Sequence, residues 1–144
     1  SRRNLQMKIL VAVDGSKPSL KAVQALIDHA ERYSRKPEVE LLTVHLPVPP
    51  VGRVPKSQLE RYSVEEGQAR PEAAKKKLHP AGIAYKPHVL VGPVAEAIVK
   101  HARHKRCDMI VIGTRGMGPV GAALIGWTAL KVLHISDIPV LLVK

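Results

Sequence analysis

The sequence predicts a three-layer α/β fold, in which helices cover both faces of a parallel β-sheet. Short apolar runs rich in valine, isoleucine and leucine alternate with longer segments whose apolar residues recur at helical spacing. Strands that alternate with helices imply parallel pairing through right-handed crossovers. The first run, residues 8–13, is apolar almost throughout, as expected for a strand that is covered on both faces.

Five runs are predicted strands: residues 8–13, 40–45, 84–91, 109–112 and 139–143. The first helix is expected after the turn Asp14-Gly15-Ser16, because Asp14 or Ser16 can cap a helix and Pro18 suits its first turn. The apolar stripe Leu20, Val23, Ile27 and Ala30 continues this helix, and the stripe Val94, Ile98 and Ala102 predicts a later one. The last helix is expected over residues 128–136.

The segment between the second and third strands has a mixed character. Residues 46–56 are rich in proline and valine and predict a loop. Residues 57–79 are mostly polar helix formers, with Gly67 and Pro71 indicating a late helix start or a break near Pro71.

Length and composition indicate one soluble domain over residues 1–144. No uncharged apolar run reaches the ~18 residues of a membrane span, and no signal peptide is visible. The single cysteine, Cys107, excludes an internal disulfide and fits a reducing compartment, so a cytoplasmic location is expected. Beside a strand, this thiol is expected to be a packing residue.

The formal net charge of +11 raises the possibility of an anionic partner. Lysine and arginine gather at residues 70–77 and 100–106, both expected as exposed helix faces. Only 3% of the residues are aromatic, however, and the sequence contains no helix-turn-helix or zinc-finger pattern. A solvated basic surface is therefore favoured over a nucleic-acid site, and no membrane partner is expected.

Glycines directly after the fourth predicted strand indicate an anion site. Gly113, Gly116 and Gly118 follow the strand, and Gly126 precedes the last predicted helix. Glycine lets backbone N–H groups approach a ligand closely, and a helix N-terminus favours an anion such as phosphate. In open α/β sheets, ligands bind beyond the carboxyl ends of the strands, where the strand order reverses.

Two phosphate motifs are not supported. Residues 116–121 spell G-x-G-x-x-G, but the acidic residue expected ~20 positions later would fall at the chain end, and Pro119 interrupts the turn. The stretch from Asp14 lacks the glycine bracket and the Gly-Lys-Ser/Thr ending of a P-loop.

Four segments together resemble the universal stress protein family over essentially the whole chain. These segments are residues 8–16, 92–98, 108–116 and 138–143. The resemblance implies a flavodoxin-like winding with strand order 3-2-1-4-5, as in adenine nucleotide α-hydrolase-like folds. It also implies a homodimer and, for one branch of the family, an ATP site with the signature G-x2-G-x9-G-[S/T].

The signature carries over with one break. Gly113, Gly116 and Gly126 occupy its glycine positions, but Trp127 stands where serine or threonine is usual. Ala129 stands where a second small hydroxyl residue is usual, leaving backbone N–H groups, Arg115 and Thr128 for the phosphates. By the same resemblance, the base and ribose would be lined by Ala12, Val13, Asp14 and Val44.

The loss of two hydroxyl groups would weaken ATP binding tenfold to a few hundredfold, since a hydrogen bond contributes on the order of 1 kcal/mol between neutral groups and ~1.5–3 kcal/mol to a charged group. Trp127 would occupy phosphate space, stack on a ligand, or be a partly buried residue in a dimer contact. The expected ligand is ATP or another adenine nucleotide, with or without magnesium.

No catalytic or metal site is predicted. The sequence shows no Ser/His/Asp set, no paired acids and no activated cysteine, so any ATP hydrolysis would be slow. His101 and His104 have a spacing that can hold a metal, but without an evident third ligand they are interpreted as solvated surface histidines. His45 and His134 are assigned to no particular site.

Three functions remain open. The first is a stress-response sensor or adaptor that binds an adenine nucleotide and works with an unidentified protein partner. The second is a dimeric interaction protein whose crevice is closed by Trp127, and the third is a nonspecific nucleic-acid binder. In the first two, pairing of the terminal strand, residues 139–143, with a second copy would cover the sheet edge.

Overall fold

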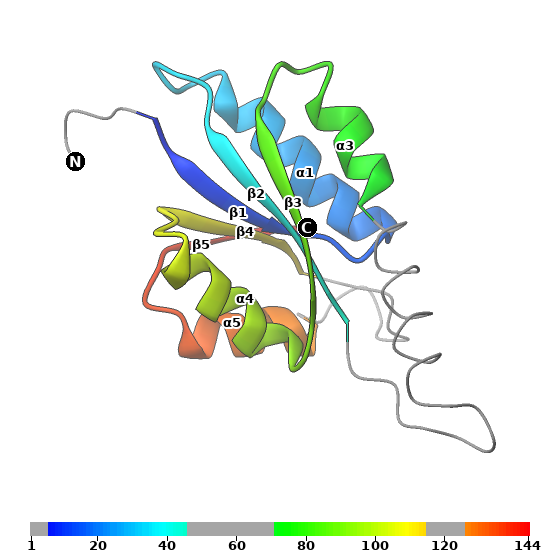
Figure 1. Ribbon diagram of the computed structural model, residues 1–144, viewed down its shortest axis with the longest axis vertical. Helices are drawn as coiled ribbons and strands as arrows, with labels where there is room; N and C mark the ends of the chain where they lie inside the picture. The colour runs from blue at the N-terminus through cyan, green and yellow to red at the C-terminus, as the bar shows by residue number, and fades with distance from the viewer. Residues whose placement is uncertain (1–5, 46–70, 115–125) are drawn as a thin grey trace.

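The computed structural model describes residues 6–45, 71–114 and 126–144 (Figure 1). Five strands form one parallel sheet in the order β3-β2-β1-β4-β5, which confirms the predicted fold class and strand order. The elements are β1 (Lys8–Ala12), α1 (Lys17–Ala30), β2 (Glu38–His45), α3 (Glu72–Leu78), β3 (Tyr85–Val91), α4 (Val94–His104), β4 (Met109–Gly113), α5 (Trp127–Ile135) and β5 (Val140–Val143).

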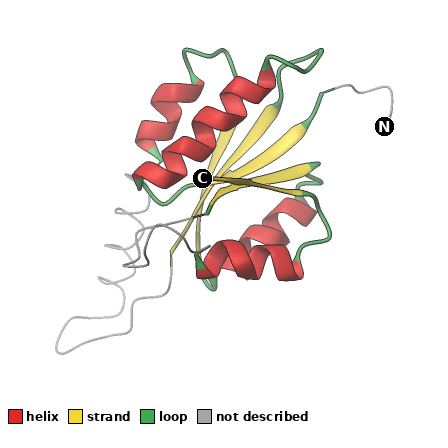
Figure 2. Cartoon of the chain, turned by 180° about the vertical axis from the view of Figure 1, so that it is seen from behind, coloured by secondary structure: helices red, strands yellow, loops and turns green. Residues whose placement is uncertain are grey.

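The helices cover the sheet in two layers, with α1 and α3 on one face and α4 and α5 on the other (Figures 1 and 2). Side chains alternate between the faces along each strand. Ile9 and Val11 of β1 thus pack on the α1 side, whereas Leu10 packs on the α4 side. This two-sided burial explains why the central strands are apolar without interruption.

The predicted strand boundaries differ from the observed ones by one or two residues. β2 begins at Glu38, because residues 38 and 39 pair with Lys8 and Ile9 of β1. β1 ends at Ala12, although the N–H of Val13 still donates to the carbonyl of Leu42 at 2.9 Å. These ends depend on pairing between strands, which the local pattern of hydrophobicity does not determine.

Helix starts follow the predicted capping residues. Ser16 caps α1 by accepting a hydrogen bond from the N–H of Ser19 at 3.3 Å, and Pro18 lies in the first turn. Pro71 immediately precedes α3, in agreement with the helix start or break expected near this proline. The loop predicted for residues 46–56 and the part of the next segment before Pro71 lie outside the described residues.

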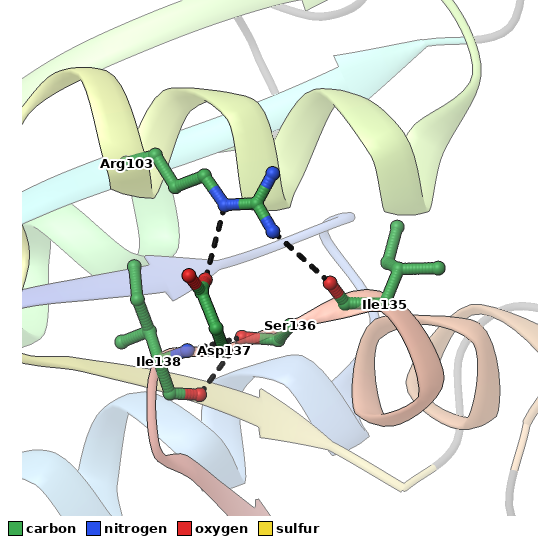
Figure 3. A network of polar contacts seen from close by, with 5 residues as sticks. All are labelled: Arg103, Ile135, Ser136, Asp137 and Ile138. Carbon is green, nitrogen blue, oxygen red and sulfur yellow. Dashed lines mark hydrogen bonds and ion pairs between the residues drawn. The ribbon is translucent and has the colours of Figure 1, made fainter.

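The turn between α5 and β5 is held by a polar network (Figure 3). From α4, Arg103 donates through Nε to Oδ1 of Asp137 at 3.0 Å and through its guanidinium to the carbonyl of Ile135 at 3.3 Å. The hydroxyl of Ser136 donates to the carbonyl of Ile138 and accepts from its N–H. The hydrogen bond from Arg103 lowers the pKa of the exposed Asp137 carboxyl. These contacts fix the direction in which β5 enters the edge of the sheet.

None of the described helices is both long enough and apolar enough to cross a membrane.

Candidate functional site

The carboxyl ends of β1, β2 and β4 meet at one edge of the sheet. These strands are parallel neighbours, and Val11 is in register with both Leu41 and Val111. Ala12 at the end of β1 and Gly113 at the end of β4 are therefore brought to the same edge. The chain runs from β1 outward through β2 to β3 and then returns to β4 on the other side of β1, so the switch point of the sheet lies between β1 and β4 at this edge.

The predicted base and ribose residues lie at the ends of β1 and β2. Val13 and Val44 are buried, and Ala12 and Asp14 are half-buried. Oδ1 of Asp14 accepts a hydrogen bond from the N–H of Ser16 at 2.9 Å, which stabilises the turn into α1. Gly15 in this turn has φ +82°, a conformation that favours glycine. Asp14 thus has a structural role, and a carboxylate keeps further lone pairs for a ligand.

The predicted phosphate-binding residues lie where β4 ends and α5 begins. Gly113 is the buried last residue of β4, and the N–H of Thr114 donates to the carbonyl of Val143 at 2.9 Å. The N–H of Gly126 donates to the carbonyl of Thr114, which places the start of α5 at the end of β4. Gly126 is the N-cap of α5 and provides no capping side chain. Within the described part of the chain, the first N–H groups of α5 have no side-chain cap, so they can donate to an anion.

Arg115 and Gly116, the other predicted phosphate-binding residues, lie outside the described residues.

The three residues at the start of α5 point in different directions. Trp127 is 82% exposed, Thr128 is half-buried, and Ala129 is buried at 2% exposure. In the single chain the indole of Trp127 is mostly exposed, so its partial burial in a dimer contact stays a prediction. Ala129 instead packs in the core between the sheet and the two helices α4 and α5.

One of the two histidines predicted to be exposed on the surface is buried instead. His104 is exposed as expected, but His101 is only 9% exposed, so its interpretation as a solvated surface histidine is wrong. Its ring lies beside that of His88, with 4.5 Å between the ring centroids. Burial lowers the pKa of His101, and the neighbouring His88 lowers it further. His45 is buried and His134 is exposed.

The grouping of Glu40, His88 and His101 was missed by the sequence analysis. Among the described residues, these three offer ligand atoms that all lie within 4.8 Å of one another. The available signal was an acid and a histidine flanked by apolar residues within predicted strands, at Glu40 and His88. Their proximity to His101 depends on strand order and on the placement of α4, which local patterns do not give.

Cys107 is a buried packing residue, as predicted. It is 6% exposed and contributes to the core beneath α4 and α5. Burial raises the pKa of its thiol to about 11, so the thiol is protonated at neutral pH.

The two basic runs lie on opposite faces of the sheet. Lys75, Lys76 and Lys77 belong to α3, whereas Lys100 and Arg103 belong to α4 (Figure 1). Two of these cations have acidic partners: Lys75 pairs with Glu72 in the same helix, and Arg103 pairs with Asp137. The described cations therefore do not form one continuous track for a nucleic-acid backbone.

An open groove between α4 and α5 is separate from the carboxyl edge. It is lined by Glu96, Val99, Lys100, Arg103 and Ile135. Most of these residues lie in the C-terminal halves of the two helices, whereas the N-terminus of α5 lies at the carboxyl edge. We therefore assign the candidate anion site to the strand ends and not to this groove.

A sheet of order β3-β2-β1-β4-β5 defines a doubly wound α/β protein, a class in which ligands bind beyond the carboxyl ends of the strands. A family model described as the universal stress protein family matches residues 7–144. The chain belongs to this family.

Individual relatives agree with this assignment. The universal stress protein MJ0531 of Methanocaldococcus jannaschii is 34% identical over 144 residues, which cover 98% of this chain and 84% of the relative. The solved structure of MJ0577 from the same organism superposes with a TM-score of 0.82 at 27% identity, covering 97% and 96% of the two chains. A universal stress protein of Archaeoglobus fulgidus, solved in complex with dAMP, has a TM-score of 0.69 at 24% identity and covers 97% and 99%. At that identity, the likeness to the dAMP complex shows the fold alone.

Proposed function

We propose that this protein is a cytoplasmic stress-response sensor or adaptor that binds an adenine nucleotide at the carboxyl edge of its sheet. The observation that carries the proposal is the contact between Gly126 and Thr114. It holds the uncapped N-terminus of α5 against the glycine end of β4, beside the β1 end that carries Asp14. The dipole of α5 and its first N–H groups then face the space where a phosphate would lie.

A universal stress protein with the same fold has been solved with dAMP bound. This supports an adenine nucleotide as the ligand to test. The half-buried Asp14 suits a ribose hydroxyl, since a carboxylate accepts hydrogen bonds strongly. The buried Val44 provides an apolar surface for the base.

The residues at the start of α5 predict weak phosphate binding. Trp127 and Ala129 replace the hydroxyl residues of the family signature, so α5 offers mainly N–H groups and Thr128. The indole of Trp127 is 82% exposed, which argues against closure of the crevice by this side chain within one chain. We therefore expect binding of AMP and of ATP with similar affinities, because the outer phosphates gain few additional contacts.

Calorimetric titration of the purified protein with AMP, Mg-ATP and cyclic AMP tests the proposal. We expect one nucleotide site per chain with a dissociation constant of about 1–100 µM, equivalent to roughly 5.5–8 kcal/mol. No heat with any of the three nucleotides at millimolar concentration would contradict it and would favour the interaction-protein alternative.

A matched pair of variants locates the site. Asp14→Asn keeps an oxygen that can accept from Ser16 while removing the charge, and it should weaken the nucleotide about tenfold. Asp28→Asn makes the same chemical change on the exposed side of α1 and should leave the affinity unchanged. Equal affinities for both variants would place the nucleotide elsewhere.

We further propose a homodimer through the edge strand β5. Among the described strands, β5 pairs with β4 alone, and the bonds from Ile110 to Pro139 and from Thr114 to Val143 show that alternate residues face β4. The backbone groups of Val140 and Leu142 consequently face the open edge, where a second copy can pair with them. The helix α5, which contacts β5, carries an exposed apolar stripe formed by Trp127, Leu130 and Leu133, and we propose that the same dimer contact covers it.

The proposed activity is binding and not catalysis. Asp14 is engaged with the turn into α1, and burial keeps the Cys107 thiol protonated. Neither group is therefore poised as a base or nucleophile for ATP hydrolysis. We expect an unidentified protein partner to recognise the surface of the nucleotide-bound protein.

A further inference from the structure

A second group of side chains lies on the α4 side of the sheet, away from the proposed nucleotide site. Glu40 lies in the amino-terminal half of β2, His88 in β3 and His101 in the last turns of α4. Because His88 is in register with Leu42, it shares a sheet face with Glu40 two positions away. At 3.3 Å per residue, Glu40 is about 13 Å along β2 from Val44 at the carboxyl edge.

The group is buried and densely polar. Glu40 is 2% exposed, and its Oε2 lies 2.7 Å from Nε2 of His88. His101 is 9% exposed and packs on the ring of His88 with an interplanar angle of 58°. Within the described parts of the chain, Nε2 of His101 is buried without a hydrogen-bond partner. A buried polar atom without a hydrogen-bond partner lowers the stability of a folded protein. A ligand bound to this nitrogen would remove that cost.

We propose that Glu40, His88 and His101 form a binding site for a divalent transition metal ion such as Zn²⁺. One ligand atom from each side chain lies within 4.8 Å of the other two. Tetrahedral zinc with bonds of about 2.0–2.2 Å holds its ligands roughly 3.4 Å apart, so modest side-chain rotations would close the site. Two imidazoles and one carboxylate suit zinc, whereas magnesium prefers oxygen ligands throughout.

The local electrostatics also suit a cation. The buried carboxylate of Glu40 offers an oxygen within 4.8 Å of the ligand atoms of both imidazoles, and its negative charge attracts a cation. Lys105, at the C-cap of α4, opposes a dication, but its charge acts on His101 less strongly than that of the buried Glu40. The side chain of His88 is 26% exposed, which provides a path for the ion and a water molecule at the fourth coordination position.

Zinc titration of untagged, chelator-treated protein at pH 7.5, followed by calorimetry, tests this site. We expect one Zn²⁺ per chain with micromolar or tighter affinity. His88→Ala and Glu40→Gln should each lower the affinity at least about tenfold, because each removes one of only three protein ligands. His104→Ala removes an exposed histidine one turn away on α4 and should leave the affinity unchanged.

Two controls separate metal binding from folding. Circular dichroism identifies any variant that fails to fold, and His88→Ala is the more tolerant one because its side chain is partly exposed. Substitution with Co²⁺ should give the visible absorption of a tetrahedral nitrogen–oxygen site, which His88→Ala should abolish. The proposal would be overturned by the absence of zinc binding to the wild type, or by equal affinities of the wild type, His88→Ala and Glu40→Gln.

Discussion

The backbone N–H of Gly126 donates a hydrogen bond to the carbonyl oxygen of Thr114. This bond joins the first residue before α5 to the first residue after β4. It fixes the helix N-terminus at the strand end whatever side chain follows Gly126. The backbone part of the proposed phosphate site therefore survives the replacement of the usual hydroxyl residue by Trp127.

Trp127→Ser should strengthen ATP binding. The indole is 82% exposed, so its removal should cost the fold little, and serine restores a hydroxyl donor at the helix N-terminus. One hydrogen bond to a charged group contributes about 1.5–3 kcal/mol, equivalent to roughly a 10- to 150-fold gain. Calorimetry with Mg-ATP measures this gain.

Leu130→Ser is the matched control for that variant, since it places a hydroxyl on an exposed position one turn further into α5. It should leave ATP affinity unchanged. If Trp127→Ser also leaves the affinity unchanged, the first turn of α5 does not contact the phosphates.

Leu133→Glu should convert the proposed dimer to a monomer. Leu133 is 40% exposed on the apolar stripe of α5, so the charge costs the isolated chain little but would be buried between two copies. Lys131→Glu places the same side chain about 160° around the axis of α5; it also removes an exposed ion pair with Glu96, which contributes little to stability, and should leave the dimer intact. Light scattering at low micromolar concentration measures both masses. A wild-type monomer, or a Leu133→Glu dimer, would contradict the proposed interface.

Much of the fold could be predicted because its signals are local. The unbroken apolar runs identify strands that are covered on both faces, and the residues Ser16 and Pro71 mark helix starts. Strand ends were less certain because they depend on pairing, as when Glu38 joins β2 opposite Lys8. The strand order came from family resemblance, since alternation alone does not determine it.

The candidate site was predictable only in part. The spacing of the glycines located the end of β4 and the start of α5, because glycine is typical of turns and of residues that flank a helix. No local sequence pattern predicts that Trp127 is exposed or that His101 is buried. On α4, Ala102 and His101 are both buried while the adjacent Arg103 is exposed, and only the packing of α4 on the sheet determines which neighbours are covered.

Leu10→Ala should strongly destabilise the protein. Leu10 lies on the central strand, is fully buried and packs beneath α4 and α5, so its truncation leaves a cavity. The expected loss in the free energy of unfolding is about 2–5 kcal/mol, measured by urea denaturation. Val91→Ala, at a 50% exposed position of β3, should cost less than about 1 kcal/mol. Similar losses for both variants would contradict the assigned core.

Cys107 should react slowly with alkylating agents in the native protein. Burial, with Glu40 as the next cause, raises the pKa of this thiol from 9.0 to about 11. Because the thiolate is the reactive form, only about one molecule in a thousand is reactive at pH 8, against about one in ten for an unperturbed thiol. The native rate should therefore be at least about 100-fold below that of the urea-unfolded chain.

The pH profile of alkylation tests the cause. A raised pKa means that the thiolate appears only as the pH rises toward 11, so the native rate should still be increasing at pH 10. In the unfolded chain the rate should level off soon above pH 9. Above pH 9 the unfolded state releases this proton first, so the same shift should lower stability as the pH rises from 9 to 11. Equal native and unfolded rates at pH 8, measured by mass spectrometry of the alkylated protein, would place Cys107 at the surface.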